Sequence, residues 1–343
     1  MSELRLGVIG CGAVTEAYHL PAIEASETVS LAALVDPDED RARRLAGDRP
    51  VAVARRPQEV LDRIDAAIVA VPNHLHAPVT EDLLRVGVPV LVEKPMALTG
   101  AECREMIRLA RDRGVVLAVG HMRRFVPAAD YIRRLVASGV LGGITRFDFR
   151  EGMEYGWNVR TDFAFRPETG GGVLADMGVH VLDLLLWWLG DWAEVTCRDD
   201  SMGGVEAESE LDLVLASGAR GVVELSRTRK LRNTYRIEGT EGALETEFGI
   251  RPVPTVRLAL GDGEMEGTPV PAGQAEGALD LRREGLRVFV RQLDDFADAV
   301  RNGRDPLVTG EEGARAVELV EACYRERELL RYPWVFPPAG ATS

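Results

Sequence analysis

Short apolar, β-branched runs alternate with amphipathic segments along the first third of the chain. The runs are apolar on both faces, as strands covered by helices on both sides must be, and they predict strands at 4–9, 29–35, 66–71, 88–92 and 115–119. The segments between them have helical spacing, most clearly at 78–86 and 100–113, and Thr99 with Glu102 matches a capping box. Repeated strand–helix units predict a doubly wound parallel sheet with a ligand site at the carboxyl ends of its strands.

The pattern changes after residue 120. Helical spacing predicts helices at 127–137, 286–302 and 311–330, and a strongly apolar helix at 173–189. Alternating segments separated by short glycine turns predict a mostly antiparallel sheet with one covered face, from strands at 144–150, 208–215, 220–227, 234–238 and 243–247. The stretch 261–277, rich in glycine, proline and acid, predicts an exposed loop. Two α/β domains are therefore expected, over residues 1–122 and 123–343.

The composition narrows the possible functions. With 343 residues, 46% hydrophobic and 28% charged, the chain is long enough for two cores and is typical of a soluble protein. Its net charge of −14 argues against nucleic acid and anionic membranes as partners, because both would be repelled. The longest apolar stretch, 181–189, contains Asp183 and is too short to span a bilayer. Two short basic runs, Arg123 with Arg124 and 227–232, are interpreted as solvated faces.

Cysteine use and the start of the chain indicate the compartment. The four cysteines are scattered and form no C-x-x-C pair, which argues against a disulfide framework and against a structural zinc site. No signal peptide precedes the first predicted strand. A cytoplasmic protein without a bound metal is therefore expected.

A glycine-rich turn joins the first predicted strand to the first helix. Its backbone can approach a pyrophosphate at a helix N-terminus because its residues are mostly small: Gly10, Cys11, Gly12, Ala13 and Val14. Thr15 stands where the G-x-G-x-x-G pattern has its third glycine. Asp36, after the second strand, can accept hydrogen bonds from the adenosine ribose and would repel a 2′-phosphate, so NAD is favoured over NADP. Nearby arginines keep NADP open, and a helix cap without a ligand is the structural alternative.

Polar residues follow two further predicted strands at the same edge of the sheet. Pro72, Asn73 and His76 come directly after 66–71, where a nicotinamide ribose is expected. Glu93 and Lys94 follow 88–92, and Lys94 could exchange protons with a substrate or polarise its oxygen. Structural alternatives stay open, since Asn73 could cap a helix and Lys94 could only pair with Glu93. A His-x-His metal pair at 74 and 76 lacks further ligands.

A second cluster lies far downstream. Asp176 and His180 are spaced i, i+4 and therefore share one face of the predicted apolar helix. An imidazole held by a carboxylate is an oriented general acid or base. The alternatives are a helix N-terminal charge for Asp176 and a core histidine for His180.

In their order and spacing these motifs resemble the oxidoreductase family named for glucose–fructose oxidoreductase, inositol dehydrogenase and the rhizopine-catabolism protein MocA. The resembling segments are 7–21 (GVIGCGAVTEAYHLP), 35–37 (VDP), 72–76 (PNHLH), 93–95 (EKP), 122–125 (MRRF) and 170–183 (GGGVLADMGVHVLD). The resemblance implies an α/β protein with an N-terminal Rossmann dinucleotide-binding domain. It further implies a C-terminal α/β domain with a largely antiparallel open sheet, through which a homodimer or homotetramer is expected.

The resemblance also implies catalytic positions at Lys94, Asp176 and His180. In this interpretation His180 carries the proton and Lys94 is its electrostatic partner. The glycine loop, Asp36 and the turn at Glu93 match the family's dinucleotide site.

The main functional hypothesis is reversible, NAD(P)-dependent oxidation of a secondary alcohol on a cyclic polyol, sugar or sugar derivative. Aromatic, amide and guanidinium side chains that could line the substrate pocket are Arg124, Tyr155, Trp157, Asn158 and Arg160. A redox-neutral lyase, epimerase or glycosidase that uses NAD transiently would need the same residues. The remaining alternatives are a dinucleotide-binding regulator without chemistry and a metal-dependent hydrolase that is poor in ligands.

Overall fold

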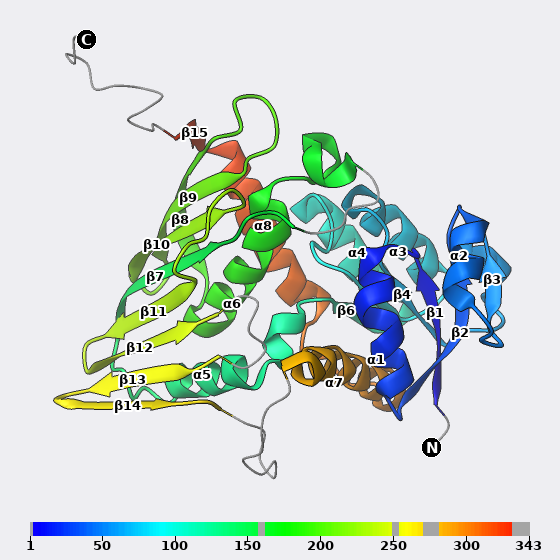
Figure 1. Ribbon diagram of the computed structural model, residues 1–343, viewed down its shortest axis with the longest axis horizontal. Coiled ribbons are helices and arrows are strands. Elements are labelled where there is room, and N and C mark those ends of the chain that lie inside the picture. Colours follow the sequence, from blue (N-terminus) through cyan, green and yellow to red (C-terminus); the bar gives the residue numbers. More distant parts are fainter. Residues whose placement is uncertain (1–2, 157–161, 249–253, 270–280, 331–343) are drawn as a thin grey trace.

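A six-stranded parallel sheet forms the first half of the protein, in the order β3-β2-β1-β4-β5-β6 (Figure 1). The computed structural model describes residues 3–156, 162–248, 254–269 and 281–330. The strands of this sheet are β1 (Leu4–Ile9), β2 (Val29–Val35), β3 (Ala52–Ala54), β4 (Ala66–Val69), β5 (Val90–Val92) and β6 (Leu117–Val119). The five predicted strands are confirmed, with later starts or earlier ends in β4, β5 and β6. The short edge strand β3 was missed because three residues carry too little pattern.

Helices cover both faces of this sheet, which is why its strands are apolar on both sides. They are η1 (Thr15–His19), α1 (Leu20–Ala25), α2 (Glu39–Ala46), η2 (Pro57–Glu59), η3 (Asn73–Leu75), α3 (His76–Arg85), α4 (Gly100–Arg113) and η4 (Met122–Phe125). The predicted capping box of α4 is confirmed, because Thr99 accepts from the Glu102 N–H and Glu102 accepts from the Thr99 N–H. The chain order reverses between β1 and β4, so the ligand crevice is expected where these two strands end.

A nine-stranded mixed sheet dominates the second half, in the order β14-β13-β12-β11-β7-β10-β9-β8-β15. Its pairs are antiparallel except β7 with β10 and β8 with β15, which confirms the largely antiparallel sheet. The strands are β7 (Ile144–Gly152), β8 (Trp192–Asp199), β9 (Glu208–Leu215), β10 (Arg220–Ser226), β11 (Thr234–Gly239), β12 (Gly242–Glu247), β13 (Val256–Leu260), β14 (Gly263–Gly267) and β15 (Arg327–Leu329).

Two predictions for this half are wrong in part. The expected loop at 261–277 contains β14, which pairs with β13 through a tight turn and is exposed at every residue, so it has no hydrophobic alternation to reveal it. The helix expected at 311–330 stops at Arg325, and β15 follows it. Residues 270–277 lie outside the described part of the chain.

Helices cover one face of the large sheet and connect it to the first half (Figure 1). They are α5 (Pro127–Ala137), η5 (Asp162–Phe165), η6 (Pro167–Thr169), η7 (Leu174–Gly178), α6 (Val179–Leu189), α7 (Leu281–Asn302) and α8 (Gly310–Arg325). One helical stretch, Pro167–Leu189, is long and apolar enough by length and composition to cross a membrane, but 78% of its most apolar window is buried inside the protein. A core helix, which is also mostly buried, passes the same test of length and composition. Within this stretch, α6 packs against α5 and α8.

The last two helices tie the two halves together. Phe289, Leu293 and Phe296 of α7 belong to the same buried cluster as Leu6 and Leu20 of the parallel sheet and its first helix. Helix α8 packs on α4 of the first half and on α6 of the second. The C-terminal part of the chain therefore belongs to both cores. This packing holds η7 and α6 against the strand ends that carry the predicted chemistry.

Candidate active site

The glycine loop after β1 has one glycine that the fold requires and one that leaves space. Gly10 has φ = 101°, and a Cβ there would lie 2.3 Å from the Ala70 carbonyl oxygen. At Gly12 a Cβ would meet no heavy atom of the described residues within 4 Å. Thr15, in the place of the third glycine, is fully buried and donates a hydrogen bond to the Gly10 carbonyl at 2.6 Å. In place of the third glycine of the motif, this threonine therefore stabilises the loop through a hydrogen bond.

Asp36 links this loop to the end of β2. Its carboxylate is 5% exposed and accepts backbone N–H bonds from Cys11 and Asp38, both at 2.9 Å. Arg41 lies 3.5 Å from the same carboxylate and 3.4 Å from Asp38. The Cys11 thiol beside it is buried, which raises its pKa to about 12, so it stays protonated and unreactive. A negative charge therefore stands beside the loop, and the nearest arginine is held by two carboxylates.

The polar side chains after β4 contact mainly backbone carbonyl groups. Asn73 donates from its side-chain amide to the Gly170 carbonyl at 2.9 Å and so connects the two halves, and Pro72 precedes it as the N-cap of η3. His76 is 1% exposed, with one ring nitrogen 2.7 Å from the Pro95 carbonyl oxygen and the other 2.9 Å from that of Val71. The prediction that His76 contacts the cofactor is corrected, because both of its nitrogens face backbone oxygens inside the protein.

Lys94 and Asp176 meet across the domain interface. The Lys94 ammonium donates to the Asp176 carboxylate at 2.8 Å and to its backbone carbonyl at 2.9 Å, and its side chain is 17% exposed. Arg227 donates to the other carboxylate oxygen of Asp176. Burial raises the pKa of Asp176, but Lys94 and Arg227 together outweigh this and hold it below its usual range. Asp176 is therefore a permanent anion that positions two cations.

His180 lies one helical turn from Asp176, in α6. Its Nδ1 atom is buried and has no hydrogen-bond partner among the described residues, which leaves Nε2 as the nitrogen that can reach a ligand. Burial, followed by the positive charges of Lys94 and Arg123, holds the pKa of His180 well below its usual value of 6.5. The imidazole is consequently neutral at neutral pH and able to accept a proton. Asp176 bonds Lys94 and Arg227, so the predicted carboxylate–imidazole pair is replaced by a carboxylate–cation cluster beside the histidine.

A buried contact between Glu93 and His19 adjoins Lys94. Glu93 contacts Nε2 of the fully buried His19 at 2.9 Å and accepts the backbone N–H of Lys94 at 3.2 Å. Burial raises the pKa of Glu93, but the bond to His19 and the nearby positive charges outweigh it and leave the pKa lowered. Glu93 thus shapes the turn that presents Lys94, next to the cis peptide bond between Lys94 and Pro95.

The five predicted substrate residues lie in different surroundings. Tyr155 lies near the cluster, with the Arg227 guanidinium 4.7 Å above its ring and with its hydroxyl buried. Arg124 does not fit the predicted role, because it is 2% exposed, forms a two-pronged bond to Asp183 and contacts Glu312 at 2.8 Å. Trp157, Asn158 and Arg160 lie outside the described residues.

Comparison with known proteins places the chain in a family. The model described as "Oxidoreductase family, NAD-binding Rossmann fold" matches residues 4–121, and the "GFO/IDH/MocA C-terminal domain" matches residues 130–245. A 1,5-anhydro-D-fructose reductase from Ensifer adhaerens is 30% identical, over 90% of this chain and 92% of that protein. The chain belongs to the GFO/IDH/MocA family of oxidoreductases.

Two further similar proteins cover nearly the whole of this oxidoreductase. D-xylose 1-dehydrogenase (NADP(+)) 2 from Haloferax volcanii is 28% identical over 95% of this chain and 98% of that protein. The crystal structure of an aldose–aldose oxidoreductase from Caulobacter crescentus, complexed with glycerol, has a TM-score of 0.80 at 26% identity, over 95% of this chain and 97% of that one. The family and the fold predicted from the sequence are both confirmed.

The glycine loop of this oxidoreductase fits the family's NAD(P) cofactor. The open space at Gly12 and the helix that starts at Ala13 and Val14 offer a pyrophosphate a close backbone approach and free N–H groups. Asp36 directly follows the last residue of β2, the position from which a carboxylate could bond the ribose of a dinucleotide. The residues that would hold the dinucleotide are therefore those of the loop, Asp36 and the turns after β4 and β5.

Sequence reasoning missed several members of the site. Arg227 was interpreted as part of a solvated run, yet its side chain is 16% exposed and bonds Asp176. Arg123 forms two 2.7 Å bonds to Glu151 and one of 3.1 Å to the Tyr235 hydroxyl. A basic run at the end of an apolar strand could have signalled Arg227. Nothing local in the sequence pairs Arg123 with a strand residue 28 positions away.

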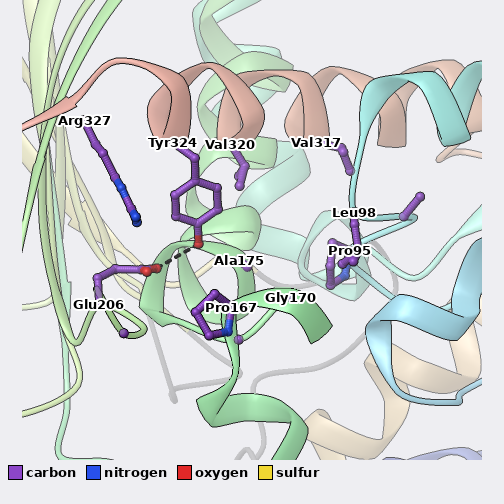
Figure 2. A pocket seen from close by; sticks show the side chains of 13 residues that line it. Pro95, Leu98, Pro167, Gly170, Ala175, Glu206, Val317, Val320, Tyr324 and Arg327 are labelled. Carbon is purple, nitrogen blue, oxygen red and sulfur yellow. Dashed lines mark hydrogen bonds between the residues drawn. The ribbon is translucent and has the colours of Figure 1, made fainter. Parts of the chain in front are cut away.

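A separate pocket of about 280 Å³ lies between the domains, beside the Lys94 turn (Figure 2). Its lining comes from the segment after β5, from η6 to η7, from the connection between β8 and β9, and from α8 and β15: Pro95, Ala97, Leu98, Pro167, Gly170, Gly171, Ala175, Gly204, Glu206, Val317, Val320, Tyr324 and Arg327. Figure 2 shows Glu206 at one end, where it accepts bonds from the Tyr324 hydroxyl and the Leu174 N–H, both at 2.9 Å. Burial raises the pKa of Glu206. The Glu206 side chain therefore has partners within the protein.

Among the described residues, no group of three or more His, Cys, Asp or Glu side chains is arranged to hold a metal ion.

Proposed function

We propose that this protein catalyses the reversible, NAD(P)-dependent oxidation of a secondary alcohol on a sugar, a cyclic polyol or a sugar derivative. The observation that carries the proposal is the contact of Lys94 with Asp176, one helical turn before His180, at the edge of the sheet where the glycine loop also lies. Segments 82 positions apart supply Lys94 and Asp176, and the contact brings a cation and a neutral imidazole to one place. A protein that only sensed the dinucleotide would need the loop alone.

The residues of the cluster have separate tasks in this reaction. The cofactor supplies the hydride acceptor when bound. His180 takes the hydroxyl proton of the substrate on Nε2, since its lowered pKa keeps the imidazole neutral and its Nδ1 atom is buried. The Lys94 ammonium stabilises negative charge on the same oxygen, and Asp176 with Arg227 holds the ammonium in position. In the reverse direction His180 returns the proton to the carbonyl oxygen.

A sugar-like substrate is supported by the residues around the cluster and by the relatives. The ring of Tyr155, next to Arg227, offers an aromatic face for the C–H side of a sugar ring. The relatives named above act, by their names, on xylose, anhydrofructose and aldoses. We therefore place the substrate among sugars and their derivatives.

We further propose NAD as the preferred cofactor. A 2′-phosphate would meet the Asp36 carboxylate, and Arg41 is already held by Asp36 and Asp38. One relative is named for NADP, so the preference needs a direct test. Asp36→Ser is expected to improve kcat/KM for NADP and to impair it for NAD, changing their ratio about tenfold or more. An unchanged ratio would reject Asp36 as the selecting residue.

The test of the activity is the absorbance of reduced nicotinamide. Purified protein is mixed with NAD or NADP, supplied separately, and with a panel of sugars, inositols and sugar nucleotides. Formation of the reduced cofactor with one substrate class supports the dehydrogenase. If the sugar is converted while no reduced cofactor accumulates and the dinucleotide stays bound, a redox-neutral lyase, epimerase or glycosidase takes its place.

A cytoplasmic homo-oligomer is proposed for the assembly. The four cysteines are all free, as in a reducing compartment, and the helices cover only one face of the nine-stranded sheet. Its other face carries ion pairs between neighbouring strands, such as Arg150 with Asp148 and with Glu224. Light scattering after gel filtration would measure the mass, and a monomer would reject this assembly.

A further inference from the structure

His121 is a buried histidine with unsatisfied nitrogens beside the catalytic one. It follows β6 at the same sheet edge at which Lys94 follows β5, and its side chain is fully buried. Neither of its ring nitrogens has a hydrogen-bond partner among the described residues, and the same holds for Nδ1 of His180. Buried nitrogens of this kind are normally bonded, and leaving one unbonded costs about 1–3 kcal/mol. Three such atoms on two neighbouring rings therefore call for an explanation.

The distance between the two rings indicates a bridge. The ring centres lie 6.3 Å apart, with the planes at 80° to each other. In a direct N–H···N bond between two imidazoles the ring centres lie roughly 5–6 Å apart, because each centre is about 1 Å from its nitrogen, so a separation of 6.3 Å is just too long for a direct bond. One water between them satisfies a nitrogen on each ring, as buried waters commonly do. The polar lining that such a water needs is provided by the unpartnered nitrogens themselves.

The charges around His121 determine which of its nitrogens faces the bridge. Nδ1 lies 3.8 Å from the Asp183 carboxylate of α6, which is itself held by Arg124 of η4. Lys94 and Glu93, at the turn after β5, are the other charged groups that act on the ring. A carboxylate cannot donate a proton, so the N–H of His121 belongs on Nδ1. Its Nε2 atom then carries a lone pair and is an acceptor.

We propose that His121 is a positioning residue that accepts the Nδ1–H of His180 through one bridging water and so keeps the lone pair of His180 on Nε2. The inference rests on the proposed function, in which His180 takes the substrate proton. During oxidation the O–H bond breaks and an N–H bond forms at Nε2, while the C–H electron pair leaves as hydride to the nicotinamide and C=O forms. The imidazolium later gives its Nε2 proton to solvent. With the proton on Nε2 at the outset, His180 could not accept another there.

The expected loss of activity on replacing His121 follows from its role as a positioning residue. Groups that orient a reacting histidine through a hydrogen bond change activity by roughly 10–100-fold when removed. The loss is expected in kcat, because the His121 side chain is fully buried and is proposed to act through His180. The Michaelis constants for substrate and dinucleotide are expected to stay within about twofold of the wild-type values.

The experiment compares His121→Phe, which keeps a ring and removes the acceptor, with His121→Asn, which retains a polar acceptor. The chain contains five histidines, so nitrogen-15 labelling of histidine gives a spectrum simple enough to assign. We expect the Nδ1–H tautomer for His180 in the wild type at pH 8 and a shift toward Nε2–H in His121→Phe. The phenylalanine variant is expected to lose 10–100-fold in kcat, and the asparagine variant to recover part of it.

Several results would overturn the inference, and they separate it from the proposed function. An Nε2–H tautomer for His180 in the unmodified protein overturns it even if His121→Phe fails to fold. Wild-type kcat and tautomer in a folded His121→Phe overturn it as well. His180→Ala is the reference: if that variant is inactive while His121→Phe is unchanged, only the role of His121 fails. If His180→Ala keeps full turnover, the proton carrier of the proposed function fails and the inference fails with it.

Discussion

Replacing Lys94 by methionine removes the one ammonium of the proposed catalytic cluster and keeps most of the apolar stem. The Lys94 ammonium reaches a carboxylate and a carbonyl oxygen of Asp176 at 2.8 and 2.9 Å, and Arg227 bonds the second carboxylate oxygen. Asp176 therefore keeps a cationic partner in the variant. The loss of folding stability is expected to stay below about 2 kcal/mol, because only one charged hydrogen-bonding group is removed.

The loss of activity is expected to be much larger than the loss of stability. A positioned donor that stabilises charge on a reacting oxygen is worth about 10²–10³ in kcat, or roughly 2.7–4 kcal/mol of the activation barrier. Lys94→Met should therefore lower kcat by about that factor, while the Michaelis constant of the dinucleotide changes little. The assay follows the absorbance of reduced nicotinamide under saturating substrate, and thermal unfolding of the same preparation measures stability.

Lys230→Met is the matched control. Lys94 and Lys230 are the two lysines of the chain, and Lys230 is exposed, so the same substitution there should change neither kcat nor the melting temperature. A folded Lys94→Met with kcat within threefold of the wild type would refute the electrostatic role. A rise in the substrate's Michaelis constant with kcat unchanged would reassign Lys94 to binding alone.

Three further predictions concern the glycine loop, a buried ion pair and the effect of pH. Gly12→Ala should leave the melting temperature unchanged and raise the Michaelis constant of the dinucleotide about tenfold, because its methyl group occupies the pyrophosphate approach. Gly10→Ala should instead lower the melting temperature, because its Cβ would lie 2.3 Å from the Ala70 oxygen; an unfolding scan separates the two. Arg124→Met leaves the Asp183 carboxylate buried without its guanidinium and should cost about 3–5 kcal/mol in a urea titration. Burial lowers the folded-state pKa of His76, His121 and His180 below 6.5, so the unfolded chain binds more protons as the pH falls. The free energy of unfolding should therefore be highest above pH 6.5 and should fall as the pH drops from 6.5 toward the folded-state pKa values, by up to about 1.4 kcal/mol per pH unit for each histidine. A urea midpoint that stays constant from pH 8 to 5 would contradict this.

Local signals in the sequence were sufficient for most of the first domain. Strands buried on both faces need continuous apolar runs, so β1 and β2 were predicted with their exact bounds. The α4 capping box was predicted because both of its partners are three residues apart. The positions of Lys94 and His180 were also predicted, because residues that follow strand ends or share a helix face are determined by short spacings.

Tertiary packing decided which polar residues are available to a ligand. The sequence made Arg124 and His76 candidate ligand contacts and Arg227 a solvated residue. Packing buried Arg124 against Asp183, turned both nitrogens of His76 onto backbone carbonyls and brought Arg227 to Asp176. Arg124 and Asp183 are 59 positions apart, and Arg227 and Asp176 are 51 positions apart, so no local pattern encodes either pair. The Pro95 carbonyl that faces His76 is 19 positions away.

The sequence by itself determined the class of fold, the family and the residues at the strand edge where we propose the chemistry, because these depend on hydrophobic period and on short motifs. Only the tertiary structure decided the crossing of α7 into the first core, the pairing of Lys94 with Asp176 and the placement of His121 beside His180. The physical reason is that a local pattern records which apolar side chains are buried. The identity of its neighbour depends on how separate elements pack, and that is set by the whole chain.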